Sequence, residues 1–210
     1  MSATESSTTD GRVPSQLDLD TLSRQLNRPV RDVVEIPARC VCGNPLVAAT
    51  APRLSNGIPF PTTYYLTHPV LTAAASRLEA AGLMNQMTER LALEPELAAA
   101  YQHAHESYIG AREAIGERAG TGPVPEIAGI SAGGMPTRVK CLHVLIGHSL
   151  AAGPGVNPLG DEALAAVAQW WTAETCHCAG AWDNQAPVPN KDLSRHVKHL
   201  NQQNSNQQNS

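Results

Sequence analysis

The sequence is poor in aromatic residues and in basic charge, and each shortage narrows the possible functions. Aromatic residues make up 4% of the 210 residues, and Phe60 is the single phenylalanine. The core must therefore be built mainly from Leu, Val, Ile and Ala, which favours closely packed helices. The formal net charge is -4, whereas proteins that bind nucleic acid or membrane surfaces generally present a basic face. We expect neither of these general activities, although a local basic patch is compatible with this charge.

Long apolar runs are also missing. No run approaches the roughly 20 residues that span a bilayer, and the polar residues after Met1 do not resemble the basic and then apolar start of a signal peptide. We therefore expect a cytoplasmic protein with no membrane partner. In that reducing compartment, an odd number of cysteines, five in all, indicates thiols or metal ligands rather than a disulfide framework.

The spacing of apolar residues predicts a single α+β domain over residues 18–182, between a disordered lead at 1–17 and a disordered polar tail at 183–210. About three strands between residues 30 and 66 are expected to form a small antiparallel sheet. Four or five helices should pack against this sheet. Helical spacing occurs in residues 18–27, 67–82, 83–93, 94–118, 139–150 and 161–171. The predicted helix caps are Asp18 or Asp20, Thr67 and Asp161.

The segment from Ser131 to His148 is a glycine-rich turn followed by a helix, and it carries Cys141 and His143. We combine these two residues with Cys40 and Cys42 into a candidate zinc site, because thiolate and imidazole suit zinc and a structural site needs four ligands. Residues two apart in a regular helix diverge by about 200°. The pair can therefore share an ion only if Cys141 precedes the helix.

Two other interpretations of these residues stay open. Cys141 can be a small core residue while His143 is a surface or capped histidine. Alternatively, Cys141 and His148, seven apart on one helix face, can act as a thiolate and its base or as metal ligands, with His68 or Cys40 approaching from elsewhere.

The glycine-rich turn also predicts an anion site. Gly133 and Gly134 precede a helix start, where backbone N–H groups can approach an anion, and Arg138 and Lys140 would add charged hydrogen bonds. The alternative is an ordinary connection with two solvated cations.

Further candidates are spread along the chain. Cys176-His-Cys178 can supply late ligands, but its position beside a polar tail is more typical of a terminus without a role. The other residues expected to line a cleft are Tyr64, His68, His105 and His148.

Several motifs together resemble one bacterial, mainly actinobacterial, protein family, the domain-of-unknown-function family 501. The motifs are Phe60-Pro-Thr-Thr-Tyr-Tyr-Leu-Thr-His-Pro69, Ser76-Arg-Leu-Glu79, Glu96-Leu-Ala-Ala-Ala-Tyr101, Ala104-His-Glu106, Arg138-Val-Lys-Cys-Leu-His143 and Gly155-Val-Asn-Pro-Leu-Gly-Asp-Glu162. The resemblance covers roughly residues 20–170. It implies a cytoplasmic housekeeping or division-linked role and supplies no chemistry.

Our first hypothesis is a binding or regulatory protein with a Cys/His zinc-type site that joins the sheet to the helix after the glycine-rich turn. The second is a small enzyme that acts on a phosphorylated or anionic substrate through Arg138, Lys140 and either Cys141 or His148. The third is a protein interaction module without a site. Zinc is the expected cofactor under the first hypothesis. The partner is then another protein or a small anionic ligand.

Overall fold

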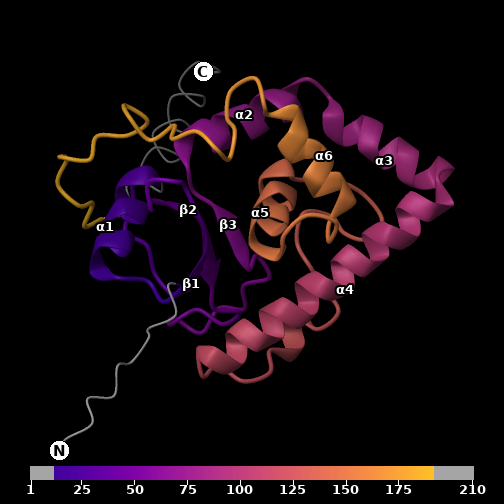
Figure 1. Cartoon of the computed structure of the whole chain (residues 1–210). Coiled ribbons are helices and arrows are strands. Elements are labelled where there is room, and N and C mark those ends of the chain that lie inside the picture. The colour runs from indigo at the N-terminus through magenta and orange to yellow at the C-terminus, as the bar shows by residue number, and fades with distance from the viewer. Residues whose placement is uncertain (1–11, 192–210) are drawn as a thin grey trace, which may run out of the picture.

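The computed structural model describes residues 12–191 (Figure 1), so residues 1–11 of the predicted lead and residues 192–210 of the predicted tail lie outside the described residues. The described strands are β1 Val33–Arg39, β2 Pro45–Thr50 and β3 Tyr64–Leu66. The described helices are α1 Gln16–Gln25, α2 Pro69–Ala80, α3 Leu83–Leu93, α4 Pro95–Arg118, α5 Leu142–Ala152 and α6 Pro158–Ala166, with a 3-10 turn, η1, at Pro125–Ile127. The strands pair antiparallel in the order β1-β2-β3. The predicted α+β class, with a small antiparallel sheet beside helices, is confirmed.

The sheet lies between α5, which packs against one face, and α1, which covers part of the other face. Its inner face packs against α5, which contacts all three strands, and this face belongs to the main hydrophobic core. Its outer face is partly covered by α1 through a small cluster of Leu22, Ile36 and Ala48. Ala48 of β2 thus lies in the outer cluster, whereas its neighbours Val47 and Ala49 lie in the main core, as expected from side chains that alternate between the two faces of a strand.

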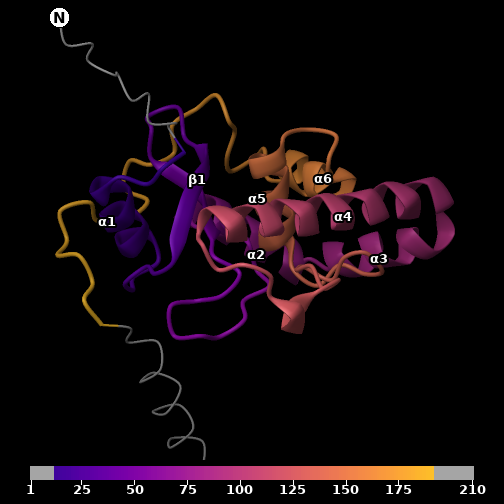
Figure 2. The same ribbon diagram turned by 90° about the horizontal axis from the view of Figure 1, so that it is seen from below.

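The remaining helices extend from the inner side of the sheet. In Figure 2 the long α4 runs beside α3 and away from the strands, and α2 joins this pair to the sheet. The helix α6 packs against both α5 and α4. Buried Tyr101, Tyr108 and Ile115 give α4 its apolar stripe, and the Tyr108 hydroxyl accepts hydrogen bonds from the Thr63 and Tyr64 amides at 2.7 and 3.3 Å.

Two glycines bring α5 close to its neighbours. A Cβ on Gly160 would lie 2.4 Å from the Leu145 carbonyl oxygen, and a Cβ on Gly147 would lie 3.4 Å from the Tyr64 carbonyl oxygen. The small residue at 160 therefore allows α6 to approach the α5 backbone closely.

The helix caps differ from three of the predictions. Ser15 caps α1, and Asp18 completes its capping box from the third helical position. His68 rather than Thr67 precedes α2, whose first residue is Pro69. Asn157 rather than Asp161 caps α6 and accepts a hydrogen bond from the Gly160 amide at 3.0 Å. The caps of α1 and α6 lie a few residues before the predicted ones, because the sequence offers several capping side chains close together.

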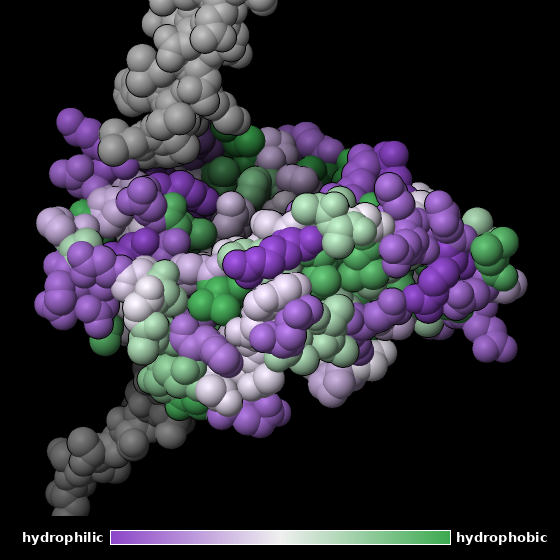
Figure 3. Space-filling view, turned by 90° about the horizontal axis from the view of Figure 1, so that it is seen from above, coloured by the Kyte–Doolittle hydropathy of each residue, from purple (hydrophilic) through white to green (hydrophobic). Residues whose placement is uncertain are grey.

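Polar and apolar side chains are interspersed over the face seen from above (Figure 3), and the green apolar groups are divided by purple polar ones. Among the helices of residues 12–191, none combines the length and the apolar character needed to cross a bilayer.

Candidate metal centres

The first cysteine pair lies at the tip of the β1–β2 hairpin. The Cys40 amide donates to the Asn44 carbonyl at 2.9 Å, and the Gly43 amide donates to the Cys40 carbonyl at 2.8 Å. Gly43 has φ +89°, which glycine adopts without a Cβ clash. The tight turn buries Cys40 and leaves Cys42 exposed.

The second pair, Cys176 and Cys178, comes from the segment after α6. This segment, orange to yellow in Figure 1, passes over the start of α2 towards α1. The Sγ atoms of Cys42 and Cys178 are 3.4 Å apart, and the four sulfurs of Cys40, Cys42, Cys176 and Cys178 all lie within 4.8 Å of one another. Sulfurs bound tetrahedrally to one zinc at about 2.3 Å would be about 3.8 Å apart. These residues, which we call the four-cysteine cluster, therefore have the dimensions and chemistry of a structural zinc site.

In the absence of a metal ion, a negative charge on one cysteine of the cluster disfavours ionisation of the neighbouring thiols. Burial raises the pKa of Cys40 and of Cys178. Burial also acts to raise the pKa of Cys42, but the Asn44 amide and the neighbouring thiols outweigh it and lower that pKa to about 7. Cys42 therefore ionises before Cys40 and Cys178, and a bound cation would stabilise the thiolate form of the cluster.

His68 lies beside the four-cysteine cluster, in contact with Cys178. It is fully buried, and its Nε2 lies 3.5 Å from the Cys178 sulfur. Burial, followed by the charge of His177, lowers the pKa of His68 to about 4, so the ring is neutral at pH 7. A neutral ring protonated on Nε2 can donate to a Cys178 thiolate, as outer groups do around bound metals. The Trp182 ring packs edge-on against His68, with centroids 5.8 Å apart.

A second cluster, formed by Glu79, Cys141 and His143, lies at the start of α5. Cys141 is the residue before the helix and has extended backbone angles, φ -157° and ψ 112°. The condition set by helix geometry is therefore met, and its Sγ lies 3.8 Å from His143 Nδ1. Glu79, near the end of α2, accepts the Leu142 amide at 2.7 Å and lies 3.1 Å from His143 Nδ1.

The His143 ring is also held on its other side. Nε2 lies 3.1 Å from the Thr72 carbonyl and 3.3 Å from the Ser76 hydroxyl. The hydrogen bond to Cys141, followed by the charge of Glu79, outweighs burial and raises the pKa of His143 to about 9. In the metal-free protein the ring is thus a cation between a thiol and a carboxylate.

The four ligands predicted for one zinc are divided between the two clusters. Cys40 and Cys42 lie with Cys176 and Cys178, whereas Cys141 and His143 lie with Glu79. The regrouping has a simple cause, because the segment after α6 returns across the hairpin and brings a second Cys-x-Cys to the first. The ion would therefore join the hairpin to this segment rather than to α5.

The other cleft candidates have separate surroundings. His148 is fully buried, stacks on Tyr64 at 5.7 Å between centroids, and lies edge-on to Tyr108. Burial lowers its pKa to about 4. His105 Nδ1 lies 2.8 Å from the Ser131 hydroxyl. His148 is thus a neutral part of the core, and Cys141 has His143 rather than His148 as its neighbour.

The glycine-rich turn, where the sequence predicts an anion site, is closed by hydrogen bonds within the turn itself. Gly133 and Gly134 have positive φ, and their carbonyls accept from the Lys140 and Arg138 amides at 2.7 and 3.2 Å. Arg138 and Lys140 are exposed. The negative charge at the first amide of α5 comes from the protein's own Glu79 carboxylate. An anion at Gly133, Gly134, Arg138 and Lys140 stays a prediction from the sequence.

Two cavities lie along the sheet. One, of about 500 Å³, is lined by Cys141 and His143 together with Tyr64, Tyr65 and Thr72. The other, of about 370 Å³, lies on the outer side of the sheet beside α1. The cavity of about 500 Å³ therefore lies beside the second cluster and is large enough to hold a small ligand.

Three ligand candidates were missed or undervalued from the sequence: Glu79, Cys176 and Cys178. The repeated Cys-x-Cys spacing was a usable signal for the two cysteines. Glu79 had no comparable signal, because its role depends on how α2 packs against α5.

Comparison with family models matches residues 36–165 to a family described as a protein of unknown function, DUF501. No curated protein and no solved structure gives a significant match. The matched residues include Cys40, Cys42 and the whole second cluster, but end before Cys176.

Proposed function

Since the chain belongs to the DUF501 family of proteins of unknown function, we propose from its own geometry that it is a zinc-binding protein of the binding or regulatory kind. Cys40, Cys42, Cys176 and Cys178 hold the ion. Four protein ligands leave no open position on a tetrahedral zinc, so this ion has a structural role. It fastens the segment after α6 to the β1–β2 hairpin, and function is carried by the surface formed there.

The observation that carries this proposal is that a segment without regular structure brings two cysteine sulfurs to the two at the tip of the β1–β2 hairpin. Between Thr172 and Lys191 the chain forms no helix or strand. Irregular stretches of this length within a compact domain are uncommon unless something else orders them. Its contacts with the rest of the domain include the hydrogen bond from Arg24 Nε to the Ala186 carbonyl at 2.8 Å and the packing of Trp182 on His68. An ion at the four-cysteine cluster supplies the missing constraint.

The test is metal content in the full chain purified without chelator. We expect stoichiometric zinc, and we expect Cys178→Ser to remove one equivalent. His177→Ala is the matched control, because His177 lies between two ligands but its Nε2 accepts the Thr172 amide at 3.2 Å. Zinc content that does not change in Cys178→Ser would refute the proposal. So would a metal-free protein with a Cys42–Cys178 disulfide under reducing conditions.

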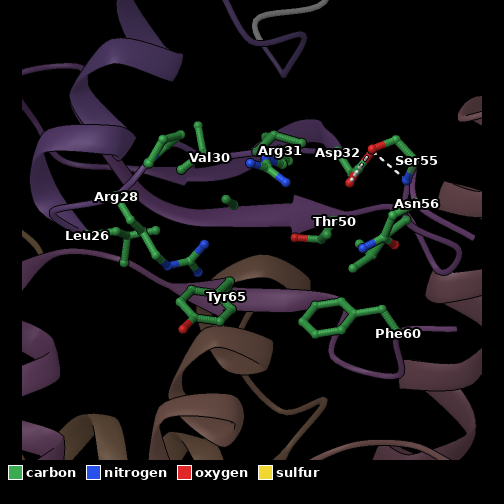
Figure 4. Close-up of a pocket in the computed structure, with 14 residues that line it drawn as sticks. Leu26, Arg28, Val30, Arg31, Asp32, Thr50, Ser55, Asn56, Phe60 and Tyr65 are labelled. Carbon is green, nitrogen blue, oxygen red and sulfur yellow. Dashed lines mark hydrogen bonds between the residues drawn. The ribbon is translucent and has the colours of Figure 1, made fainter. Parts of the chain in front are cut away.

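A second candidate function is the binding of a small anionic molecule, in the outer cavity of the sheet. Figure 4 shows the Arg28 and Arg31 side chains extending into this cavity, with the Tyr65 and Phe60 rings on its other side. The Arg28 guanidinium lies 5.6 Å from the Tyr65 ring centroid. Two cations beside two aromatic rings suit a ligand that carries both phosphate and a flat ring. The nearby Asp32 carboxylate accepts from the Ser55 amide at 3.0 Å.

Titration with ATP and with inorganic pyrophosphate tests this candidate. Arg28→Ala and Arg31→Ala should each weaken binding by about tenfold or more, the loss of one charged hydrogen bond. Arg138→Ala, in the loop where the sequence predicted the anion, should leave the affinity unchanged. If neither probe binds, or if affinity depends on Arg138 instead, the outer cavity is not the anion site.

A further inference from the structure

Three different donor atoms converge at the start of α5. They are the Cys141 sulfur, a His143 ring nitrogen and a Glu79 carboxylate oxygen, all within 4.8 Å of one another. Cys141 and His143 come from the start of α5, and Glu79 comes from the last turn of α2. Because α2 packs against α5, the fold holds the three donors together without an ion.

The hydrogen bonds of the His143 ring decide which nitrogen faces the cluster. The Thr72 carbonyl, 3.1 Å from Nε2, can only accept. The hydrogen of a neutral ring is therefore assigned to Nε2, and the lone pair of Nδ1 points at the thiol and the carboxylate. Metal-binding histidines are typically oriented in this way, by a carbonyl that receives the other ring N–H.

A metal ion at the point that these three donors share would take the place of the proton that lies between them in the metal-free protein. A tetrahedral zinc with ordinary bond lengths places sulfur and nitrogen ligands about 3.6 Å apart, and nitrogen and oxygen ligands about 3.4 Å apart. The separations from His143 Nδ1 are 3.8 Å to Cys141 Sγ and 3.1 Å to Glu79 Oε1. Both differ from the ideal values by a few tenths of an ångström, which small side-chain adjustments can supply.

The three donors leave a fourth coordination position, and the cavity lies beside them. Cys141 and His143 both line the space of about 500 Å³ that Tyr64, Tyr65 and Thr72 also enclose. Sites with three protein ligands and one open position are the kind that act on ligands, whereas four-ligand sites are structural.

We propose that Glu79, Cys141 and His143 form a second, open zinc site, distinct from the four-cysteine cluster, whose fourth position takes an oxygen-donor ligand from the cavity. Water or a small carboxylate or phosphate can occupy that position. The protein then binds two metal ions per chain, one that fixes structure and one that presents a reactive position.

The test is zinc stoichiometry in the full chain after metal removal and controlled reloading. We expect two ions per chain in the wild type and one in Cys141→Ala, His143→Ala and Glu79→Gln. Glu79→Gln is the most informative variant, because an amide oxygen still accepts the Leu142 N–H while the ionic ligand is lost. Its affinity for the second ion should fall by about 100-fold or more. Circular dichroism and thermal unfolding establish that each variant folds.

Matched controls separate this site from general effects. His103→Ala removes an exposed histidine of α4 and should keep two ions. In a Cys42→Ser and Cys178→Ser background, cobalt should still give a thiolate charge-transfer band, of roughly a quarter of the intensity expected for four sulfurs.

Two outcomes separate the proposals. One zinc per chain, lost in Cys178→Ser and kept in Cys141→Ala, overturns the second site and leaves the four-cysteine cluster as the zinc site. One zinc per chain, lost in Cys141→Ala and kept in Cys178→Ser, does the reverse. Rapid alkylation of Cys141 that excess zinc does not slow also overturns the second site, because the cluster is then a thiol–imidazole pair.

Discussion

Removing zinc from the four-cysteine cluster should release the segment after α6 while the rest of the domain stays folded. Fixing the backbone from Thr172 to Cys178 costs about 7–14 kcal/mol, at roughly 1–2 kcal/mol per residue. Within this stretch the Thr172 amide donates to His177 Nε2 at 3.2 Å and the His177 ring packs on Trp171 with centroids 6.4 Å apart, and each of these contacts contributes about 1 kcal/mol. Structural zinc contributes about 10–16 kcal/mol in small domains. A zinc ion at this cluster would therefore supply most of the free energy that orders these residues.

Hydrogen exchange measures this effect residue by residue. In the zinc-loaded protein the Thr172 and Ala181 amides, which donate to His177 Nε2 and to the Cys178 carbonyl, should be protected. After chelation, or in Cys178→Ser, this protection should fall to the level of an unfolded chain. The Thr50 amide, which pairs with the Thr63 carbonyl at 2.9 Å in the sheet, should keep its protection.

Two controls make the experiment decisive. His177→Ala removes the acceptor of one amide but no ligand, so it should affect Thr172 alone. Cys141→Ala removes a ligand of the second cluster and should leave the whole segment protected. If protection of the segment persists after elemental analysis has verified zinc loss, the segment is held by its own packing, and the reasoning from ordering cost is refuted.

Further predictions concern acid stability and close packing. Hydrogen bonding to Arg39 lowers the pKa of Asp18 from 3.8 to about 2, so this pair contributes about 2 kcal/mol that is fully present above about pH 4 and is lost as pH falls towards 2. Asp18→Asn should therefore lower the free energy of unfolding at pH 7 by about 2 kcal/mol. Urea unfolding at a series of acid pH values should also show that the stability of this variant depends less on pH. An unchanged dependence on pH would contradict the role given to the Asp18–Arg39 pair. Gly160→Ala should destabilise the domain by about 1–3 kcal/mol in the same assay, because its Cβ would meet the Leu145 carbonyl. Gly110→Ala on α4 is the control, since a Cβ there meets nothing within 4 Å, and it should be neutral or stabilising by up to about 1 kcal/mol; equal losses in the two variants would show that close approach is not the cause.

Local chemistry in the sequence was sufficient for most of the fold. Strand alternation predicted the hairpin of β1 and β2, and helical spacing predicted α2 to α4 to within a few residues. Cap positions were less certain, because Ser15, Asp18 and Asp20 are all suitable caps and only the folded geometry selects one. Helical spacing predicted a helix over residues 139–150, which includes Cys141, and set a place before the helix only as the condition for sharing an ion with His143. The structure begins α5 at Leu142 and so meets that condition.

What the sequence determined by itself is which residues have the chemistry to bind a metal, since cysteine and histidine carry it wherever they lie. Which of them lie close enough to share an ion was decided by tertiary structure alone. Cys42 and Cys178 are 136 positions apart, and they meet only because the chain after α6 returns across the hairpin. Glu79 joins Cys141 and His143 because α2 packs against α5. Ligand spacing along a chain predicts a site when one short element carries all the ligands, and both clusters in this protein draw on separate elements.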